Sequence, residues 1–279
     1  MIRNILVGYD GSRSGMVAVE QAMGVADATD GRLHLATVVE ASDSTAEDEL
    51  LGGELDPVQA AMPLDDEEPE EPLAAPPDIE EIKAACEARH IVCEQGTVFS
   101  EGAGASLVRR SWLADLVVVD RSSAPGQAGA AELGPTARHL VNRLVSPTLV
   151  CARQYLHIRS ALIVYQASVS SGRALSFAAE LCEEMNVSLD VLACDPDRRV
   201  AAAALEEARP ALRGYHVEGE YSVSVNPPAE AMRNAAMERE VSVIIVPDAR
   251  RRSWGLPWRR NEVLWRALEI PNTAVLAYP

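Results

Sequence analysis

Arg3-Asn4-Ile5-Leu6-Val7-Gly8-Tyr9-Asp10-Gly11-Ser12 opens the chain with an apolar run that ends in Asp-Gly-Ser. A continuous Ile-Leu-Val run is typical of a strand that is covered on both faces, as in a parallel sheet. A helical pattern follows at once, and Ser12 or Ser14 can accept a hydrogen bond from the first free amides of that helix. The stretch therefore predicts a buried strand, a tight turn and a helix start. Such an edge is where α/β proteins bind ligands.

The same unit returns later in the chain when residues 2–39 are laid, without a gap, on residues 158–195. At 279 residues with 48% hydrophobic residues, the chain has enough material for two domains that each bury a core. We therefore predict a tandem repeat, with one domain at residues 1–153 and a second at residues 158–279. The matched pairs include Leu6 and Leu162, Tyr9 and Tyr165, and Ser12 and Ser168.

Strands and helices alternate along both predicted domains, with crossovers long enough for parallel pairing. The join at residues 153–157 is too short to act as a free tether. We expect the domains to pack through their final strands, because that contact buries two exposed sheet edges. The predicted strands are 5–9, 33–39, 91–99, 116–120 and 148–152, then 162–165, 189–194, about 215–224, 243–246 and 274–277. The predicted helices are 14–29, 78–88, 103–113 and 135–144, then 172–185, 198–212, 229–238 and 262–268.

The net charge of −17 comes from one segment of the chain. Residues 40–81 hold sixteen Asp and Glu and no Lys or Arg, so the rest of the chain carries a net charge of only −1. The centre of this acidic insertion, which spans about residues 41–77, is Pro-rich and has too little apolar surface to offset the entropy of ordering. The insertion is interpreted as a solvated loop that aids solubility. An interaction tail for a basic partner is the alternative.

Several classes of function are not indicated. The apolar runs are only strand-length and the N-terminus lacks the regions of a signal peptide, so we expect a cytoplasmic protein with no membrane span. The five cysteines contain no Cys-x-x-Cys pair and are interpreted as buried or partly buried thiols, not metal ligands or disulfides. There is no Gly-x-Ser-x-Gly elbow, His-Glu-x-x-His motif or P-loop. His34 and His216 fall on strand patterns and the other histidines are isolated, so the sequence does not predict an enzyme.

Four stretches of the first domain carry a family resemblance: the opening run, Leu-His-Leu-Ala-Thr-Val-Val-Glu at 33–40, Ala-Asp-Leu-Val-Val-Val-Asp at 114–120 and Val-Ser-Pro-Thr-Leu-Val-Cys at 145–151. In this order they resemble the universal stress protein (UspA-like) family. The resemblance covers residues 1–153 and extends more weakly, through the internal repeat, to residues 158–279. It implies an α/β fold of two tandem adenine-nucleotide α-hydrolase-like domains, each a five-stranded parallel sheet flanked by helices, packed about a pseudo-twofold axis. It also implies, for some members, ATP bound at the carboxyl edge of the sheet.

The resemblance also assigns a candidate nucleotide site. In members that bind ATP, a carboxylate after the first strand meets the ribose, the backbone of a valine ending the second strand meets the adenine, and a Gly-x2-Gly-x9-Gly-(Ser/Thr) loop after the fourth strand cradles the phosphates. Asp10 and Val38 match the first two roles. The candidate loop residues are Asp120, Gly126, Gly129, Gly134 and Thr136, with Arg121 and Arg138 available for an anion.

The loop departs from the family pattern. Asp120 and Ser123 stand at the first two glycine positions, and Gly134 comes one residue late and is followed by Pro135. Gly126 and Gly129 have the two-residue spacing of the first two glycines in the pattern, but His139 stands where the third glycine should follow. A carboxylate among the phosphates repels them, and a proline removes an amide from the helix start. The second domain departs further, because Gln166 replaces the carboxylate.

The sequence therefore predicts a non-catalytic stress-response regulatory or scaffold protein with a degenerate site for ATP or AMP in its first domain. One alternative is an ATP- or AMP-binding signalling protein with weak ATPase activity. The other is a protein-interaction module that uses the acidic segment Asp65 to Glu71 or the basic loop Arg250 to Arg260, two segments that could also attract each other. An isoelectric point of 4.7 argues against nucleic acid as a partner. We expect a pseudo-dimer within one chain, and the sequence leaves a homodimer open.

Overall fold

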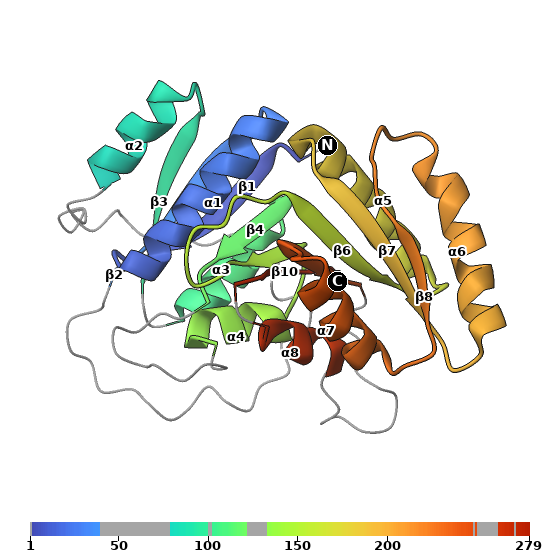
Figure 1. The fold of residues 1–279 in the computed structure, drawn as a ribbon. Helices are drawn as coiled ribbons and strands as arrows, with labels where there is room; N and C mark the ends of the chain where they lie inside the picture. The colour runs from blue at the N-terminus through green and yellow to red at the C-terminus, as the bar shows by residue number, and fades with distance from the viewer. Residues whose placement is uncertain are drawn as a thin grey trace.

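The computed structural model describes residues 2–39, 79–99, 102–121, 133–247, 249, 262–270 and 272–279. Within these ranges, ten strands form one continuous sheet that is covered by helices on both faces (Figure 1). The predicted α/β class is confirmed. The acidic segment Asp65 to Glu71 and the basic loop Arg250 to Arg260 lie outside the described residues, as does the predicted attraction between them.

The two halves of the chain, residues 2–152 and 158–279, build their parts of the sheet in the same strand order. The order is β3-β2-β1-β4-β5 in the first half and β8-β7-β6-β9-β10 in the second, and neighbouring strands within each half are parallel. The first-half strands are β1 (Asn4–Tyr9), β2 (Arg32–Val39), β3 (Cys93–Phe99), β4 (Leu116–Val119) and β5 (Thr148–Val150). The second-half strands are β6 (Ser160–Tyr165), β7 (Ser188–Cys194), β8 (Tyr221–Ser224), β9 (Val243–Val246) and β10 (Ala274–Ala277).

The halves join through their final strands. β5 and β10 pair antiparallel, with Leu149 opposite Leu276 and Val150 opposite Val275. The predicted pairing of the final strands is confirmed. It turns two exposed sheet edges into one ladder and leaves β3 and β8 as the outer strands. The division into domains at 1–153 and 158–279 stays a prediction.

The helices form two layers, one on each face of the sheet. One layer holds α1 (Arg13–Thr29), α2 (Ile79–Ala88), α5 (Val169–Met185) and α6 (Arg198–Leu212), and α1 contacts α5 over the middle of the sheet (Figure 1). The other layer holds α3 (Ala103–Ser111), α4 (Pro135–Asn142), α7 (Pro228–Glu238) and α8 (Glu262–Leu268). No helix among the described residues has both the length and the apolar character needed to cross a bilayer.

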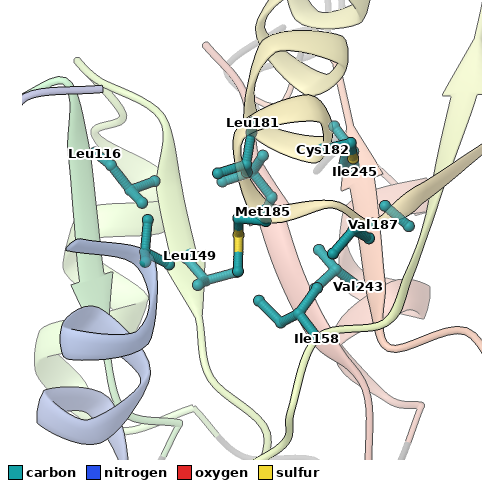
Figure 2. A pocket seen from close by; sticks show the side chains of 12 residues that line it. Leu116, Leu149, Ile158, Leu181, Cys182, Met185, Val187, Val243 and Ile245 are labelled. Carbon is teal, nitrogen blue, oxygen red and sulfur yellow. The ribbon is translucent and has the colours of Figure 1, made fainter. Parts of the chain in front are cut away.

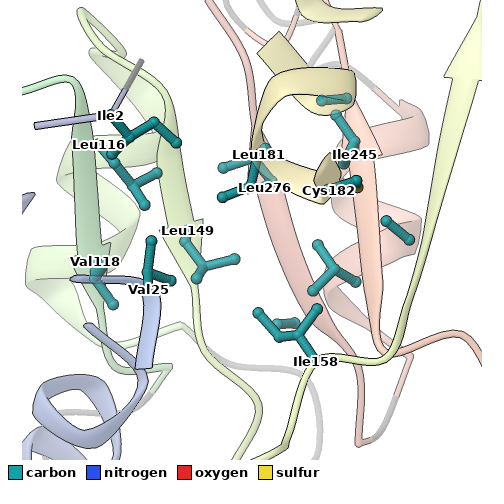
Figure 3. Close-up of a cluster of buried hydrophobic side chains, with 14 of the residues drawn as sticks. Ile2, Val25, Leu116, Val118, Leu149, Ile158, Leu181, Cys182, Ile245 and Leu276 are labelled. Carbon is teal, nitrogen blue, oxygen red and sulfur yellow. The ribbon is translucent and has the colours of Figure 1, made fainter. Parts of the chain in front are cut away.

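Side chains alternate along the strands into two separate cores. In β1, Ile5 and Val7 pack beneath α1, whereas Leu6 packs into the opposite layer. This two-sided burial explains why the opening stretch is continuously apolar. Near the junction, Leu149 and Leu276 lie in one cluster that draws side chains from both halves (Figure 3). The two halves therefore share a core.

Matched serines cap matched helices. Ser12 Oγ accepts a hydrogen bond from Gly15 N at 2.9 Å, so Ser12, not Ser14, is the N-cap of α1. Ser168 Oγ accepts from Ser171 N at 3.1 Å at the start of α5. Each hydroxyl satisfies one of the amides that a helix start leaves unpaired. The repeat seen in the sequence is thus also a repeat of local structure.

The strand predicted from about residue 215 is shorter than expected. β8 begins at Tyr221, and His216 lies before it, where its backbone N–H donates to Glu183 Oε1 at 2.8 Å. The prediction that His216 lies on a strand is therefore wrong. Gly219 passes so close to the Leu189 carbonyl that a side chain at this position would collide with it. Leu189 N and Val191 N still donate to Glu218 O and Glu220 O, each at 2.8 Å, but Glu220 N donates to Asp190 Oδ1 at 2.8 Å, so the ladder with β7 is only partly formed before Tyr221.

Candidate functional site

The carboxyl ends of β1, β2 and β4 lie together at one edge of the sheet. β1 pairs with β2 on one side and with β4 on the other, and all three are parallel. The chain leaves β1 toward β2 and returns later to β4, so this edge contains a topological switch point, where α/β sheets commonly bind ligands. Asp10 follows β1 and Asp120 follows β4, while Val38 is the penultimate residue of β2. The structure therefore brings these three predicted residues to one edge.

The Asp10 carboxylate is held in place by the turn that starts α1. Its Oδ1 accepts a hydrogen bond from Ser12 N at 3.0 Å, and Ser12 Oγ lies 3.0 Å from Ser14 Oγ. A Cβ at Gly15 would lie only 2.7 Å from Asp10 Oδ1, so a glycine is needed there for the carboxylate to pack against the helix. Asp10 is half-buried. A fixed, partly exposed carboxylate is suited to accepting hydrogen bonds from hydroxyl groups.

Arg121 binds the other half of the chain. Its guanidinium donates to three carbonyl oxygens at and after the last residue of α8: Leu268 O at 3.0 Å, Ile270 O at 3.1 Å and Thr273 O at 2.7 Å. The residue is only 6% exposed. Burial lowers the pKa of Arg121, and the nearby positive charge of Arg153 lowers it further. The expectation that Arg121 is available for an anion is wrong, because the side chain is buried and both of its terminal nitrogens donate across the junction.

The start of α4 offers few donors for a phosphate. Gly134 N donates to the Arg121 carbonyl at 2.9 Å, which fixes both ends of the segment between them. Pro135 has no N–H, and Thr136 is half-buried at the second position of the helix. Gly126 and Gly129 lie outside the described residues. In the described part of the predicted phosphate loop, the Gly134 N–H is already used and Pro135 has no N–H. Neither residue therefore offers a backbone donor to a ligand.

Asp120 adds negative charge to this edge. The residue is 9% exposed, and its charge, together with burial as the larger cause, raises the pKa of the Cys151 thiol. A nucleotide phosphate near the end of β4 would therefore meet a carboxylate in a poorly solvated place, where charge repulsion is weakly screened.

The described residues at the equivalent edge of the second half do not repeat this chemistry. β6 is followed by the exposed amide of Gln166, and β9 is followed by Pro247. Ser170 Oγ, near the start of α5, donates to Pro279 O at 3.1 Å, so the last residue of the chain packs beside this helix start. Neither Gln166 nor Pro247 supplies a carboxylate that could bind a ribose. The described candidate residues therefore belong to the first half only.

The described residues contain no arrangement typical of a catalytic or metal centre. No group of three or more His, Cys, Asp or Glu among them could hold a metal ion. His34 Nδ1 lies 3.2 Å from Glu94 Oε2 at the start of β2 and β3, away from the carboxyl edge. His216 Nδ1 lies 3.1 Å from Glu183 Oε1 on the exposed surface. Both pairs are surface contacts, and neither includes a nucleophile.

His139 is expected to make the stability of the protein depend on pH. The ring packs against Gly104 of α3, where a Cβ would lie 2.8 Å from His139 Cβ. Burial lowers the pKa of His139, and the charge of Arg143 lowers it further. The unfolded chain therefore binds this proton more readily than the folded chain. Stability from His139 is fully present above the unfolded pKa of about 6.5 and is lost as pH falls from there through the folded pKa.

The measurement is the melting temperature between about pH 7.5 and about pH 5 in the wild type and in His139→Gln. The wild type should lose more stability on acidification than the variant. His157→Gln, at an exposed histidine, serves as the matched control and should retain the wild-type pH dependence. Equal losses in the wild type and in His139→Gln would contradict the assignment.

An apolar cavity lies at the junction of the halves, away from the carboxyl edge (Figure 2). Its volume is about 10 Å³, which is about the space that one water molecule needs, and no polar atom lines it. Leu116 and Val243, at the first positions of β4 and β9, place it toward the amino ends of the strands. The cavity is a packing gap between α1, α5 and the sheet. It is too small and too apolar to be the ligand site.

The comparisons with known proteins agree with the fold. The model of the Universal stress protein family matches residues 1–152. Comparison with curated proteins finds no match. A functionally unknown protein, PA1789 from Pseudomonas aeruginosa PAO1, has a similar structure, with a TM-score of 0.64 at 15% identity over 99% of this chain and 92% of that chain. A universal stress protein from Archaeoglobus fulgidus DSM 4304 gives a TM-score of 0.63 at 13% identity over 99% and 97% of the two chains.

Proposed function

Because this chain belongs to the universal stress protein family, we propose that it is a non-catalytic regulatory or scaffold protein of the stress response with a degenerate adenine-nucleotide site. The site lies at the carboxyl edge of the first half. The groups proposed to bind adenosine are retained, namely the Asp10 carboxylate for the ribose and the backbone at Val38 for the adenine. Of the groups proposed to bind phosphates, the Arg121 guanidinium and the Gly134 amide are used elsewhere.

The observation that carries this proposal is the engagement of Arg121 and Gly134. The Arg121 side chain donates to three carbonyls of the second half, and the Arg121 carbonyl accepts from Gly134 N. Two positive or donor groups that could neutralise a phosphate are thus withdrawn from the edge, while the negative charge of Asp120 stays beside it. Repulsion grows with ligand charge, so ATP should be disfavoured more than AMP or adenosine.

The non-catalytic part of the proposal rests on the described side chains of the first-half edge. Phosphoryl transfer depends on positioning and charge neutralisation of the transferred phosphate, usually by Lys, Arg or a metal ion. At this edge Arg121 is buried in the junction, and the nearby acidic residue is Asp120, which is 9% exposed. A metal ion that bridges Asp120 and the phosphates would reduce the repulsion, so Mg²⁺ should improve ATP binding.

Isothermal calorimetry with adenosine, AMP and ATP tests the proposal on the wild type and on Asp120→Gly. We expect weak binding by the wild type, with AMP or adenosine preferred over ATP in the absence of Mg²⁺. Asp120→Gly should strengthen ATP binding by about tenfold, which corresponds to removing about 1.4 kcal/mol of repulsion, and should change adenosine binding little.

Glu20→Gln is the matched control, because it removes the same charge from an exposed position on α1. It should leave all three affinities unchanged. Tight ATP binding by the wild type without a metal ion would refute the interpretation of the loop. If neither the wild type nor Asp120→Gly binds any adenine nucleotide, the site does not exist and only the scaffold role is left.

A further inference from the structure

Two cysteines from adjacent elements lie side by side at the outer edge of the first half. Cys86 is in the last turn of α2, and Cys93 is the first residue of β3. The linker folds back on the helix end, where Ile91 N and Arg89 N both donate to the Cys86 carbonyl, at 2.9 Å and 3.1 Å. Cys86 is fully buried, and the half-buried Cys93 packs against the same hydrophobic cluster. The backbone thus brings the two thiols together.

The two thiols differ in their access to solvent, because Cys86 is buried and Cys93 is only half-buried. The Cys86 thiol is hydrogen-bonded to the Cys93 sulfur, which lowers the pKa of Cys93 and raises that of Cys86. The positive charge of Lys83 also lowers the pKa of Cys93, while burial and Glu94 oppose the change. Cys93 is the more accessible thiol of the pair and has the lowered pKa, so it is the one suited to react first with an oxidant.

The other three cysteines differ from Cys93. Burial raises the pKa of the thiol in each, to about 12 for Cys182 and to about 11 for Cys194, and Cys151 is raised further. Buried neutral thiols react slowly with oxidants. Cys151, Cys182 and Cys194 therefore serve as internal controls, because an oxidant that is selective for a more reactive thiol should leave them unmodified.

We propose that Cys86 and Cys93 form a thiol oxidation site that hydroperoxides convert to an intramolecular disulfide. Two sulfur ligands are too few for a tetrahedral zinc site, and the described residues provide no third ligand beside them. Oxidation is the chemistry that two adjacent thiols of unequal acidity are suited to, because one attacks and the other resolves.

The reaction proceeds in two balanced steps. The Cys93 thiolate attacks one oxygen of hydrogen peroxide, the O–O bond breaks, and hydroxide leaves and takes a proton to become water, so that Cys93 becomes a sulfenic acid. The Cys86 sulfur then attacks the Cys93 sulfur, the S–O bond breaks, and a second water leaves with the Cys86 proton. Two thiols are oxidised to one disulfide, and one peroxide is reduced to two waters.

The disulfide would fasten the end of α2 to β3. β3 is the outermost strand of the first half, and α2 contacts it directly. The closed loop would contain residues 87–92, including His90 with its positive φ of 58°. Oxidation would therefore restrain the edge of the sheet that lies farthest from the junction. This inference does not depend on nucleotide binding.

The test treats reduced full-length protein with hydrogen peroxide and measures intact mass and non-reducing peptide maps. We expect the loss of two hydrogen atoms, a linked peptide pair that contains Cys86 and Cys93, and full reversal by a phosphine reductant. Cys151, Cys182 and Cys194 should remain alkylatable after denaturation. Cys194→Ala is the matched control and should form the same disulfide at the wild-type rate.

Single variants separate the two roles. In Cys86→Ser, oxidation should stop at Cys93, which should gain oxygen atoms without forming a disulfide. Cys93→Ser and Cys93→Ala should resist the same dose of peroxide. Circular dichroism checks that each variant is folded, and the wild-type peptide map stands independently of the variants. Absence of the Cys86–Cys93 link in the wild type, or equal oxidation of Cys194, would overturn the proposal.

Discussion

Replacing Arg121 with leucine is expected to lower the free energy of unfolding by about 3–5 kcal/mol. The substitution removes the guanidinium that donates to Leu268 O, Ile270 O and Thr273 O, so three carbonyls at a buried junction lose a charged donor. Each unsatisfied buried group costs about 1–3 kcal/mol, and leucine recovers part of this through its apolar surface. Urea denaturation followed by circular dichroism measures the loss.

Two further variants define the cause of this loss. Arg121→Lys keeps the positive charge but not the planar set of donors, so it should recover only part of the stability. Arg159→Leu, at an exposed arginine, should change the free energy of unfolding by less than about 0.5 kcal/mol. A change below about 1 kcal/mol in Arg121→Leu would show that the three hydrogen bonds do not stabilise the junction.

Leu276→Ala is expected to be similarly destabilising, by about 2–5 kcal/mol. Leu276 is fully buried in β10, pairs with Leu149 of β5 across the junction, and lines the existing apolar cavity (Figure 3). Truncation would enlarge a cavity that already has no polar group to hold water, so the lost contacts would not be replaced. The free energy of unfolding in urea is again the measurement.

The partner variant Leu149→Ala extends this test. Since both leucines line one cavity and face each other in the ladder, the double variant should lose less than the sum of the single losses. Met237→Ala is the control, because Met237 is 70% exposed on α7 and its truncation should cost less than about 0.5 kcal/mol. Strict additivity would mean that the two side chains do not share a packing environment.

Arg121 and Leu276 both belong to the junction that makes one sheet from two similar halves. The second half lacks a carboxylate equivalent to Asp10 after β6, but it covers the β5 edge and supplies the carbonyls that bind Arg121. We interpret its role in the proposed function as structural. In the same arrangement, the Arg121 side chain connects the carboxyl edge of the first half to the second half.

Much of the fold could be predicted because its causes are local in sequence. The apolar runs of β9 and β10 and the helical periodicity of α6 and α8 give bounds that agree with the structure. The cap of α1 depends on Ser12 and an amide three residues away, so the sequence contains the whole interaction. The start of β8 differs from the prediction where Glu220 N donates to the Asp190 carboxylate of β7, a contact with another strand that the local sequence does not reveal.

For the candidate site, too, some features could be predicted from the sequence and others could not. The placement of Asp10 and Asp120 at one edge follows from strand order, which the alternation of strands and helices predicts. The fate of Arg121 could not be predicted, because its three acceptors lie 147 to 152 residues away and only packing of the halves brings them to the guanidinium. An arginine beside a glycine-containing loop gives the same local pattern whether it binds an anion or a junction. The sequence alone thus determined the elements and their order, whereas the availability of each charged group was decided by tertiary packing, because burial and long-range hydrogen bonds depend on residues far apart in the chain.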